Sequence, residues 1–203
     1  MASKFFAYLG RLRWIRRWGL MRNVVEENVM EHSWQVATIA HVLGLIHQQK
    51  FAGQTDPNDI AVAALYHDVS EIITGDMPSP VKYHSKAISQ AYKAIEGEAE
   101  KEVLATLPDE LQPPFARLLL HSEADQQVSR FVKAADIISA YLKCRLEVQS
   151  GNHEFADAMQ EIENSIRDLE MPEAEYFMSV FTDSYLLTLD ELLRSHDLKS
   201  NPK

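Results

Sequence analysis

The chain has 203 residues, of which 46% are hydrophobic and 25% are charged. This composition is typical of a globular protein with a sizeable core, and we expect one domain over residues 1–203 with a polar tail from about residue 195. No apolar run approaches the ~18 residues of a membrane span, and the N-terminus lacks a signal-peptide pattern, so we expect a cytoplasmic protein with no membrane partner. The single cysteine, Cys144, excludes an internal disulfide and a thiolate metal site.

The net charge of −10 argues against a nucleic-acid partner, because phosphate backbones favour a basic surface. The charge is unevenly distributed. Residues 1–22 contain six basic and no acidic side chains, so the rest of the chain carries −16. This segment could gather a small anionic ligand. The alternatives are a basic helix that pairs with acidic helices elsewhere, a transit-like amphipathic segment or a membrane-surface helix.

Apolar residues recur at helical spacing along almost the whole chain, and β-type alternation is not sustained anywhere. Proline, glycine and capping residues separate the helices. The predicted helices cover residues 5–18 with Gly19 as the C-terminal cap, 31–48, 57–75, 85–107, a shorter helix from 108 interrupted at Pro113-Pro114, 125–149, 153–169 and 172–194. Residues 76–80 contain two prolines and are expected to form a loop. The sequence therefore predicts an all-α protein, built as an irregular helix bundle.

Four ionisable residues lie close together near the end of the predicted helix 57–75, namely His67, Asp68, Glu71 and Asp76. In a continuous helix His67 and Glu71 would lie one turn apart on the same face. A metal ion on His67 would then place Glu71 close enough to act on a bound water. The alternative is a helix end at the surface that carries a few solvated charges.

Two further helices each contribute a polar residue to an otherwise apolar face. Asp136 falls on the inward face of its helix with Val132 and Ser139, and a buried carboxylate is usually paired, hydrogen-bonded or bound to a metal. His32 lies in the first turn of the strongly apolar helix 31–48, where a lone histidine would more often be a packed core residue. For Asp136, a salt bridge or a bond to a helix end remains the alternative.

Taken together, these residues supply two imidazoles and two carboxylates, each from an apolar helix. Such a mixed nitrogen and oxygen set suits Mn, Co, Fe, Ni or Zn in an open geometry rather than a closed structural zinc site. We therefore predict one divalent transition metal ion, such as cobalt or manganese. A metal ion of this kind could activate a water molecule and bind a phosphoryl oxygen. A second metal ion is not expected, because His84 and His121 have no acid at ligand-like spacing apart from Glu123.

The order His, His-Asp, Asp on helices resembles the signature of the HD superfamily of metal-dependent phosphohydrolases, and the whole chain resembles the bacterial HD-domain 5′-deoxynucleotidases. The resemblance is carried by residues 11–12, 18–24, 27–33, 66–68, 74–83, 133–136 and 141–144. It implies an HD-type helix bundle, a homodimer and the hydrolysis of deoxyribonucleoside 5′-monophosphates to deoxyribonucleoside and phosphate.

The resemblance also implies roles for individual residues. The implied metal ligands are His32, His67, Asp68 and Asp136. The implied catalytic residues are Arg17, which would orient the phosphate, Glu71 and Asp76. The implied substrate contacts are Arg17, Trp18, His32, Asp68, Asp76, Met77, Pro78, Ser79 and Asp136.

These implied roles agree with the chemistry of the side chains. Arg17 offers a planar fork of donors to a phosphate. Trp18 could form a rigid wall that excludes a ribose 2′-hydroxyl, although it could also be an aromatic anchor that closes the first helix. Asp76 could contact the sugar 3′-hydroxyl or donate a proton, or it could be a simple turn-forming residue. Glu71 as the general base and Asp76 as the acid is a hypothesis, because the resemblance does not settle which carboxylate moves the proton.

Other functions stay open at this point. The same metal site could cleave a nucleoside triphosphate or a cyclic nucleotide, although we see no added basic cluster for a polyphosphate. A non-catalytic module that holds a structural ion or a signalling nucleotide is the alternative from a different class. No residue is suited to specific base readout, so we predict broad base range together with selectivity against ribonucleotides.

Overall fold

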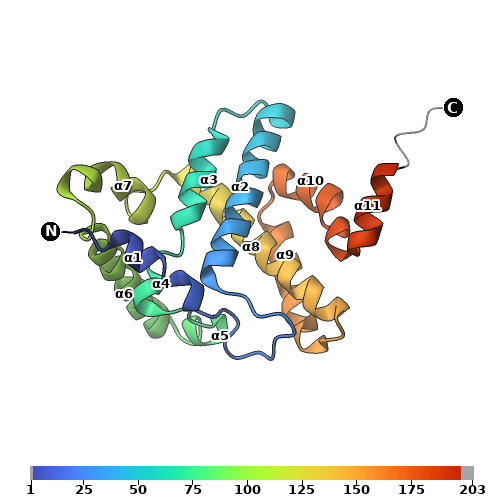
Figure 1. The fold of residues 1–203 in the computed structure, drawn as a ribbon, viewed down its shortest axis with the longest axis horizontal. Helices are drawn as coiled ribbons and strands as arrows, with labels where there is room; N and C mark the ends of the chain where they lie inside the picture. The colour runs from blue at the N-terminus through green and yellow to red at the C-terminus, as the bar shows by residue number, and fades with distance from the viewer. Residues whose placement is uncertain (1, 198–203) are drawn as a thin grey trace.

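The computed structural model describes residues 2–197, and these residues form helices without any strand (Figure 1). This finding confirms the predicted all-α class. The α-helices are α1 (Phe5–Leu9), α2 (Val29–Phe51), α3 (Pro57–Tyr66), α4 (Glu71–Thr74), α5 (Ser79–Lys82), α6 (Lys86–Leu104), α7 (Gln112–Leu119), α8 (Gln126–Gln149), α9 (Ala156–Asp168), α10 (Pro172–Phe181) and α11 (Leu189–Asp197). Four short 3-10 helices lie between them, η1 (Leu12–Trp14), η2 (Asp109–Leu111), η3 (His153–Phe155) and η4 (Asp183–Leu186).

The main core lies where α2, α3 and α8 pack together in the middle of the molecule (Figure 1). Leu43 of α2, Ile60 of α3 and Ile138 of α8 are all fully buried there. Burying a side chain of this size stabilises the fold by about 1.5–3 kcal/mol, so the three helices form a rigid frame. The N-cap of α2 is Asn28, whose side chain accepts a hydrogen bond from the Glu31 N–H, and Asp125 caps α8 in the same way.

A second, smaller core holds the N-terminal segment against the body of the molecule. Phe5 of α1 is fully buried with Val103, Leu107 and Leu119, which come from α6, the turn after it and α7. Val69 completes this cluster from the turn between α3 and α4. The turn that carries His67 and Asp68 is therefore flanked by both cores.

The first predicted helix is shorter than expected, because α1 ends at Leu9 and η1 at Trp14. Beyond this point the backbone pairs with the residues that precede α2. The Arg17 N–H donates to the Glu27 carbonyl at 3.0 Å and the Val29 N–H donates to the Ile15 carbonyl at 3.0 Å. These bonds replace those of a helix, so the prediction of a helix capped by Gly19 is wrong.

The predicted helix 57–75 is also interrupted, since α3 ends at Tyr66 and α4 begins only at Glu71. The intervening residues form a turn in which the Val69 N–H donates to the Tyr66 carbonyl and the Glu71 N–H donates to the Asp68 carbonyl. His67 and Glu71 therefore do not share one helix face, and that prediction is wrong. The predicted loop 76–80 is shorter than expected, because α5 begins at Ser79.

Two other helix boundaries differ from the predicted ones. Pro113 and Pro114 lie in the first turn of α7, where their missing N–H groups are tolerated, so they open a helix instead of interrupting one. The predicted helix 172–194 divides into α10, η4 and α11. Near this break the Thr182 hydroxyl donates to the Met178 carbonyl and the Ser184 hydroxyl to the Phe181 carbonyl, bonds that compete with a regular helix.

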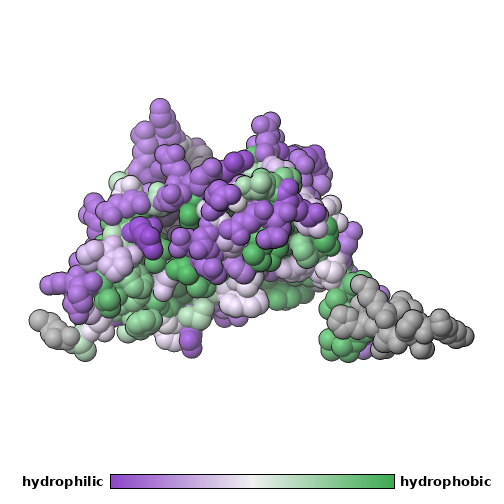
Figure 2. All heavy atoms as spheres, turned by 90° about the horizontal axis from the view of Figure 1, so that it is seen from above, coloured by the Kyte–Doolittle hydropathy of each residue, from purple (hydrophilic) through white to green (hydrophobic). Residues whose placement is uncertain are grey.

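The C-terminal helix α11 lies at one end of the molecule (Figure 1). Figure 2 shows a face with hydrophilic side chains over its upper part and many apolar side chains below them. Leu189 and Leu193 of α11 are exposed. The predicted polar tail falls partly on α11, and residues 198–203 lie outside the described part of the chain. None of the helices described is long and apolar enough to cross a membrane.

Candidate active site

The four predicted metal ligands come together next to the main core, and we call them the His–Asp cluster (His32, His67, Asp68 and Asp136). His32 lies in the first turn of α2, His67 and Asp68 directly follow α3, and Asp136 lies on α8. His32 Nε2 is 3.0 Å from Asp136 Oδ1 and 3.4 Å from Asp68 Oδ2, and His67 Nε2 is 3.1 Å from Asp68 Oδ2. The structure therefore brings these residues, which are distant in the sequence, close together.

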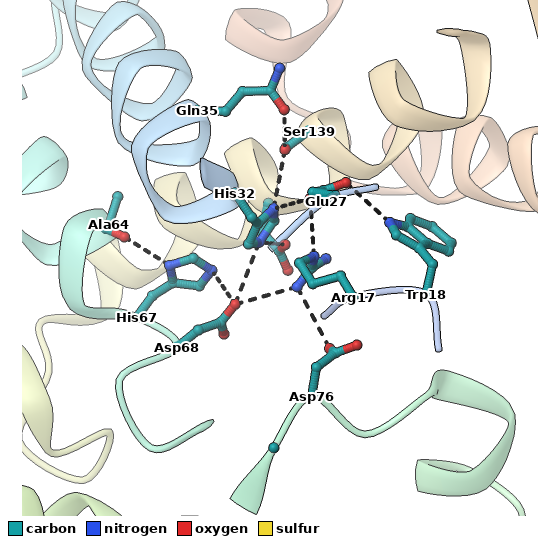
Figure 3. A network of polar contacts seen from close by, with 12 residues as sticks. Arg17, Trp18, Glu27, His32, Gln35, Ala64, His67, Asp68, Asp76 and Ser139 are labelled. Carbon is teal, nitrogen blue, oxygen red and sulfur yellow. Dashed lines mark hydrogen bonds and ion pairs between the residues drawn. The ribbon is translucent and has the colours of Figure 1, made fainter. Parts of the chain in front are cut away.

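The hydrogen bonds of the two histidines fix which nitrogen faces the cluster (Figure 3). His67 Nδ1 is 2.7 Å from the Ala64 carbonyl, which can only accept, so Nδ1 carries the proton. The Ser139 hydroxyl donates to Gln35, so it can only accept from His32 Nδ1, which lies 3.3 Å away. Both imidazoles therefore present an unprotonated Nε2 to Asp68 when they are neutral.

This donor set fits a divalent cation. One ligand atom each from His32, His67 and Asp68 lie within 4.8 Å of one another. The two Nε2 atoms are buried and have no partner with hydrogen-bond geometry, which is costly for a polar atom unless something else satisfies it. Two imidazole nitrogens and neighbouring carboxylate oxygens are ligands that divalent transition metals accept. The residues present therefore suit the metal ion that the sequence predicts.

Arg17 extends from the N-terminal segment toward the His–Asp cluster (Figure 3). Its Nη1 lies 3.5 Å from Asp68 Oδ2 and 3.7 Å from Asp76 Oδ1, and its side chain is only 13% exposed. Burial lowers the pKa of Arg17, but the charges of Asp68, Asp136, Glu27 and Asp76 outweigh burial and raise it. The guanidinium therefore remains charged, and these long ion pairs leave donors available to an anion.

Trp18 follows Arg17 in an unusual backbone conformation. Its φ is 60°, in the left-handed region that a bulky residue rarely adopts and that costs about 1–3 kcal/mol. The indole ring lies 5.3 Å from the ring of Phe155, and its Nε1 donates to Glu27 Oε2 at 3.2 Å. The surrounding contacts thus hold Trp18 in place. It does not close the first helix, which ends before it.

Glu71 and Asp76 supply carboxyl groups next to the cluster. Glu71 Oε2 is buried and has no hydrogen-bond partner. Burial, together with the charges of Asp68 and Asp76, raises the pKa of Glu71 to about 9. Burial also raises the pKa of Asp76, with Arg17 acting against it. The protonated form is therefore favoured in both groups relative to a solvated carboxyl group.

The other predicted substrate residues follow Asp76. Met77 and Pro78 are half-buried, and Ser79 is exposed at the start of α5. Pro78 and Ser79 accept backbone hydrogen bonds from α5 and the residue after it, such as that from the Tyr83 N–H to the Ser79 carbonyl. Polar contacts thus connect Arg17 directly to the cluster through Asp68, and they connect Asp76 to Arg17 and Trp18 to Glu27. Met77, Pro78 and Ser79 make no such contacts within the described part of the chain.

A groove of about 1130 Å³ adjoins the cluster on the side of α6, α7 and the start of α8. His67, Asp68 and Asp136 form part of its wall, whereas Arg17 and Trp18 do not. His121 also lines the groove, and its Nδ1 contacts the buried carboxylate of Glu100. Sequence spacing could not indicate this partner of His121, because Glu100 comes from α6, 21 residues away. The hydrogen bond with Glu100 raises the pKa of His121.

The sequence did not indicate Glu27, which contacts Arg17, Trp18 and His32. Burial raises the pKa of Glu27, but its hydrogen bond with His32 and the charge of Arg17 outweigh burial. The pKa of Glu27 is therefore below its usual value, and the carboxylate is charged. An acid next to a helix N-cap is common, so its position alone carried no signal.

The model of the YfbR-like 5′-deoxynucleotidase family matches residues 4–185, which is most of the chain. The chain belongs to this family. Its members are phosphomonoester hydrolases, and the resemblance inferred from the sequence is confirmed. The chain is 49% identical over 190 residues to the 5′-deoxynucleotidase VP0926 of Vibrio parahaemolyticus, covering 94% of this chain and 98% of that protein. It is 48% identical to the 5′-deoxynucleotidase PBPRA2627 of Photobacterium profundum, with the same coverage.

Solved structures with the same helical fold include two HD-domain proteins. An HD-domain phosphohydrolase from Listeria innocua is 23% identical, with a TM-score of 0.79 over 97% of this chain and 96% of that one. The HD phosphohydrolase of cyanophage S-2L, bound to dA and one catalytic Zn²⁺ ion, is 21% identical, with a TM-score of 0.58 over 95% and 94% of the chains. At this level of identity the likeness shows the fold, and it confirms the predicted HD-type bundle.

Proposed function

We propose that this member of the 5′-deoxynucleotidase family hydrolyses deoxyribonucleoside 5′-monophosphates to deoxyribonucleoside and phosphate with the help of one divalent transition metal ion. The residues that would hold the ion are His32, His67, Asp68 and Asp136. The observation that carries the proposal is the pair of buried, unpartnered Nε2 atoms facing Asp68, with the Arg17 guanidinium 3.5 Å beyond it. When bound, such an ion acts as a Lewis acid toward the phosphoryl group and lowers the pKa of a water molecule.

Arg17 binds and orients the phosphate in this proposal. Its guanidinium carries several donors in one plane, and its Nη1 contacts Asp68 and Asp76 only at 3.5 and 3.7 Å. Both distances exceed the 2.7–2.9 Å of a strong charge-assisted hydrogen bond. A phosphate oxygen can therefore make shorter contacts with Arg17 than these carboxylates do, and the positive charge offsets the charge of the transition state.

Glu71 and Asp76 move the protons. Glu71 is the proposed general base for the attacking water. Without a metal ion its pKa of about 9 keeps it protonated at neutral pH, and the positive charge of a bound ion would favour the ionised carboxylate that a base needs. Asp76 lies beside Arg17 and also has a raised pKa, so it is the proposed acid for the nucleoside 5′-oxygen or a contact of the sugar 3′-hydroxyl. Separate variants of Glu71 and Asp76 would show which of the two carboxyl groups protonates the leaving group.

Trp18 selects deoxyribose over ribose. Phe155 and Glu27 hold its indole ring in place. A ring that is held in place excludes a ribose 2′-hydroxyl better than a mobile ring, which could move aside. Met77, Pro78 and Ser79 contact the substrate beyond Asp76, and the base range is broad. Cobalt or manganese as the ion, a homodimer and a cytoplasmic location complete the proposal, with no nucleic-acid or membrane partner.

The test is phosphate release from metal-stripped protein resupplied with Co, Mn, Mg or Zn, on dAMP, AMP, dATP and a cyclic nucleotide. We expect preference for dAMP with a transition metal ion. Activity restricted to the triphosphate or the cyclic nucleotide would keep the metal site and overturn the substrate. Lack of activity with every metal would favour a module that only binds an ion or a nucleotide.

A further inference from the structure

We infer that Glu27 is the positioning residue of this site, because its single carboxylate fixes the phosphate-orienting Arg17, the sugar-facing Trp18 and the metal-facing His32 together. The inference rests on the proposed function for the roles of its three partners. Glu27 itself contacts none of the reacting groups in the proposal, so it would act only through these neighbours.

The geometry divides the carboxylate between its partners (Figure 3). Oε1 lies 3.1 Å from Arg17 Nε and 3.3 Å from His32 Nδ1, and Oε2 accepts from Trp18 Nε1 at 3.2 Å. The contact with Trp18 is a hydrogen bond, whereas those with Arg17 and His32 are ion-pair contacts. An ionised carboxylate has only acceptors, so it is suited to all three at once. The Glu27 side chain is 13% exposed, which strengthens these interactions relative to a solvated acid.

The backbone places Glu27 in register with its partners. The Arg17 N–H donates to the Glu27 carbonyl, and Arg16 and Asn28 form an isolated β-bridge. This pairing brings the acid opposite Arg17 and Trp18, although nine residues separate Trp18 from Glu27. The side-chain bond to Trp18 then holds the indole of a residue whose backbone φ of 60° is otherwise unfavourable.

The contact with His32 controls how that histidine faces the cluster. A carboxylate that accepts from Nδ1 keeps the proton there and leaves Nε2 free to act as a ligand. Ser139 contacts the same Nδ1, so the loss of Glu27 is expected to weaken this orientation and not to abolish it. Outer partners of this kind typically change metal affinity or activity by about 10–100-fold.

Glu27→Gln is the sharpest probe, because the amide has the same shape and only one oxygen. If that oxygen accepts from Trp18, the NH₂ group faces the donors of Arg17 and His32. If the amide group is rotated by half a turn, its oxygen faces Arg17 and His32 and its NH₂ group faces the indole N–H of Trp18. Glu26→Gln is the matched control, since Glu26 is the adjacent acid and pairs with Arg16 on the surface with 70% of its side chain exposed.

The experiment measures three quantities for the wild type, Glu27→Gln, Glu27→Asp and Glu26→Gln. They are kcat and KM for dAMP and AMP, Zn²⁺ or Co²⁺ affinity by equilibrium dialysis of the metal-stripped protein, and thermal stability. For Glu27→Gln we expect kcat/KM on dAMP to fall about 10–100-fold, the preference for dAMP over AMP to shrink, and metal affinity to fall. Glu26→Gln should match the wild type in all three. A Glu27→Gln protein with unchanged selectivity and metal affinity, whatever its stability, would overturn the inference.

Trp18→Phe gives a second test that does not need Glu27→Gln to fold well. This substitution keeps an aromatic ring but removes the indole N–H, so we expect selectivity to fall while metal affinity stays unchanged. Adding Glu27→Gln to Trp18→Phe should lower metal affinity without a further loss of selectivity, because the shared bond is already absent. Fully additive losses of selectivity would overturn the coupling. If the wild type shows no preference for deoxynucleotides, the proposed function fails, whereas the metal affinities still decide the role of Glu27 toward His32.

Discussion

Lys143 and Glu147 form an ion pair inside the protein, one turn apart on α8, with only 7% and 1% of their side chains exposed. Glu147 also accepts hydrogen bonds from the backbone N–H groups of Val24 and Val25 at 2.9 and 3.1 Å. The Lys143 ammonium donates to the Val25 carbonyl. This buried pair therefore anchors the segment between Trp18 and Glu27 to the rigid helix frame.

Removing one member of this pair should destabilise the protein strongly. Glu147→Ala leaves the Lys143 charge buried without its partner and two backbone N–H groups without acceptors, a change that typically costs about 3–5 kcal/mol. The control is Glu163→Ala, which removes an i,i+4 partner of Arg167 at the surface and should cost less than about 1 kcal/mol. Urea unfolding of both variants measures the difference. Equal losses would show that the burial of the pair has no energetic effect.

The same carboxylate should make stability depend on acid pH. The hydrogen bonds from Lys143, Asn152 and the backbone lower the pKa of Glu147 from 4.5 to about 2, although burial acts against them. Because the folded pKa is the lower one, the stabilisation is complete above pH 4.5 and is lost as the pH falls toward 2. The shift corresponds to about 3 kcal/mol. The difference in unfolding free energy between wild type and Glu147→Gln should therefore shrink over this range, and a constant difference would contradict the assignment.

The sequence predicts the helices whose apolar faces repeat regularly. Both α2 and α8 follow from this periodicity, although α2 covers Val29–Phe51 and is longer at both ends than the predicted helix 31–48. The breaks at Tyr66 and in the first predicted helix do not follow, because local hydrogen bonds and the pairing of Arg17 with Glu27 decide them. Periodicity describes which face is buried, but it does not reveal where a competing partner ends the helix.

The contacts of the candidate site also divide into those that the sequence predicted and those that it did not. Residue types and family resemblance predicted the meeting of His32, His67, Asp68 and Asp136, since buried polar residues on apolar helices need partners. Contacts between acids and partners distant in the sequence, such as Glu100 with His121, depend on the packing of helices and leave no local pattern. For the same reason the sequence did not single out Glu147, which reads as an ordinary polar position on α8.

The metal ligands can be tested through stability as well as turnover. Asp136→Asn should lower metal affinity and turnover together, because the amide lacks the negative charge that faces His32 Nε2. A ligand that binds only the folded state adds about 2.7 kcal/mol at 100 times its dissociation constant, so Zn²⁺ or Co²⁺ should raise the melting temperature of the wild type. The same concentration should raise that of Asp136→Asn much less. His84→Ala, outside the cluster, is the control and should respond like the wild type.

Glu71→Gln should lower activity and raise stability at the same time. If Glu71 is the general base, kcat should fall about 10²–10⁴-fold with metal affinity retained. Its folded pKa of about 9 lies above the ordinary 4.5, so keeping this acid in the fold costs free energy that grows as the pH rises from 4.5 to 9. The neutral glutamine avoids this cost, and the metal-stripped variant should exceed the wild type in unfolding free energy most clearly at alkaline pH. Full activity in Glu71→Gln would exclude the proposed role, and lower stability than wild type at pH 8 would contradict the raised pKa.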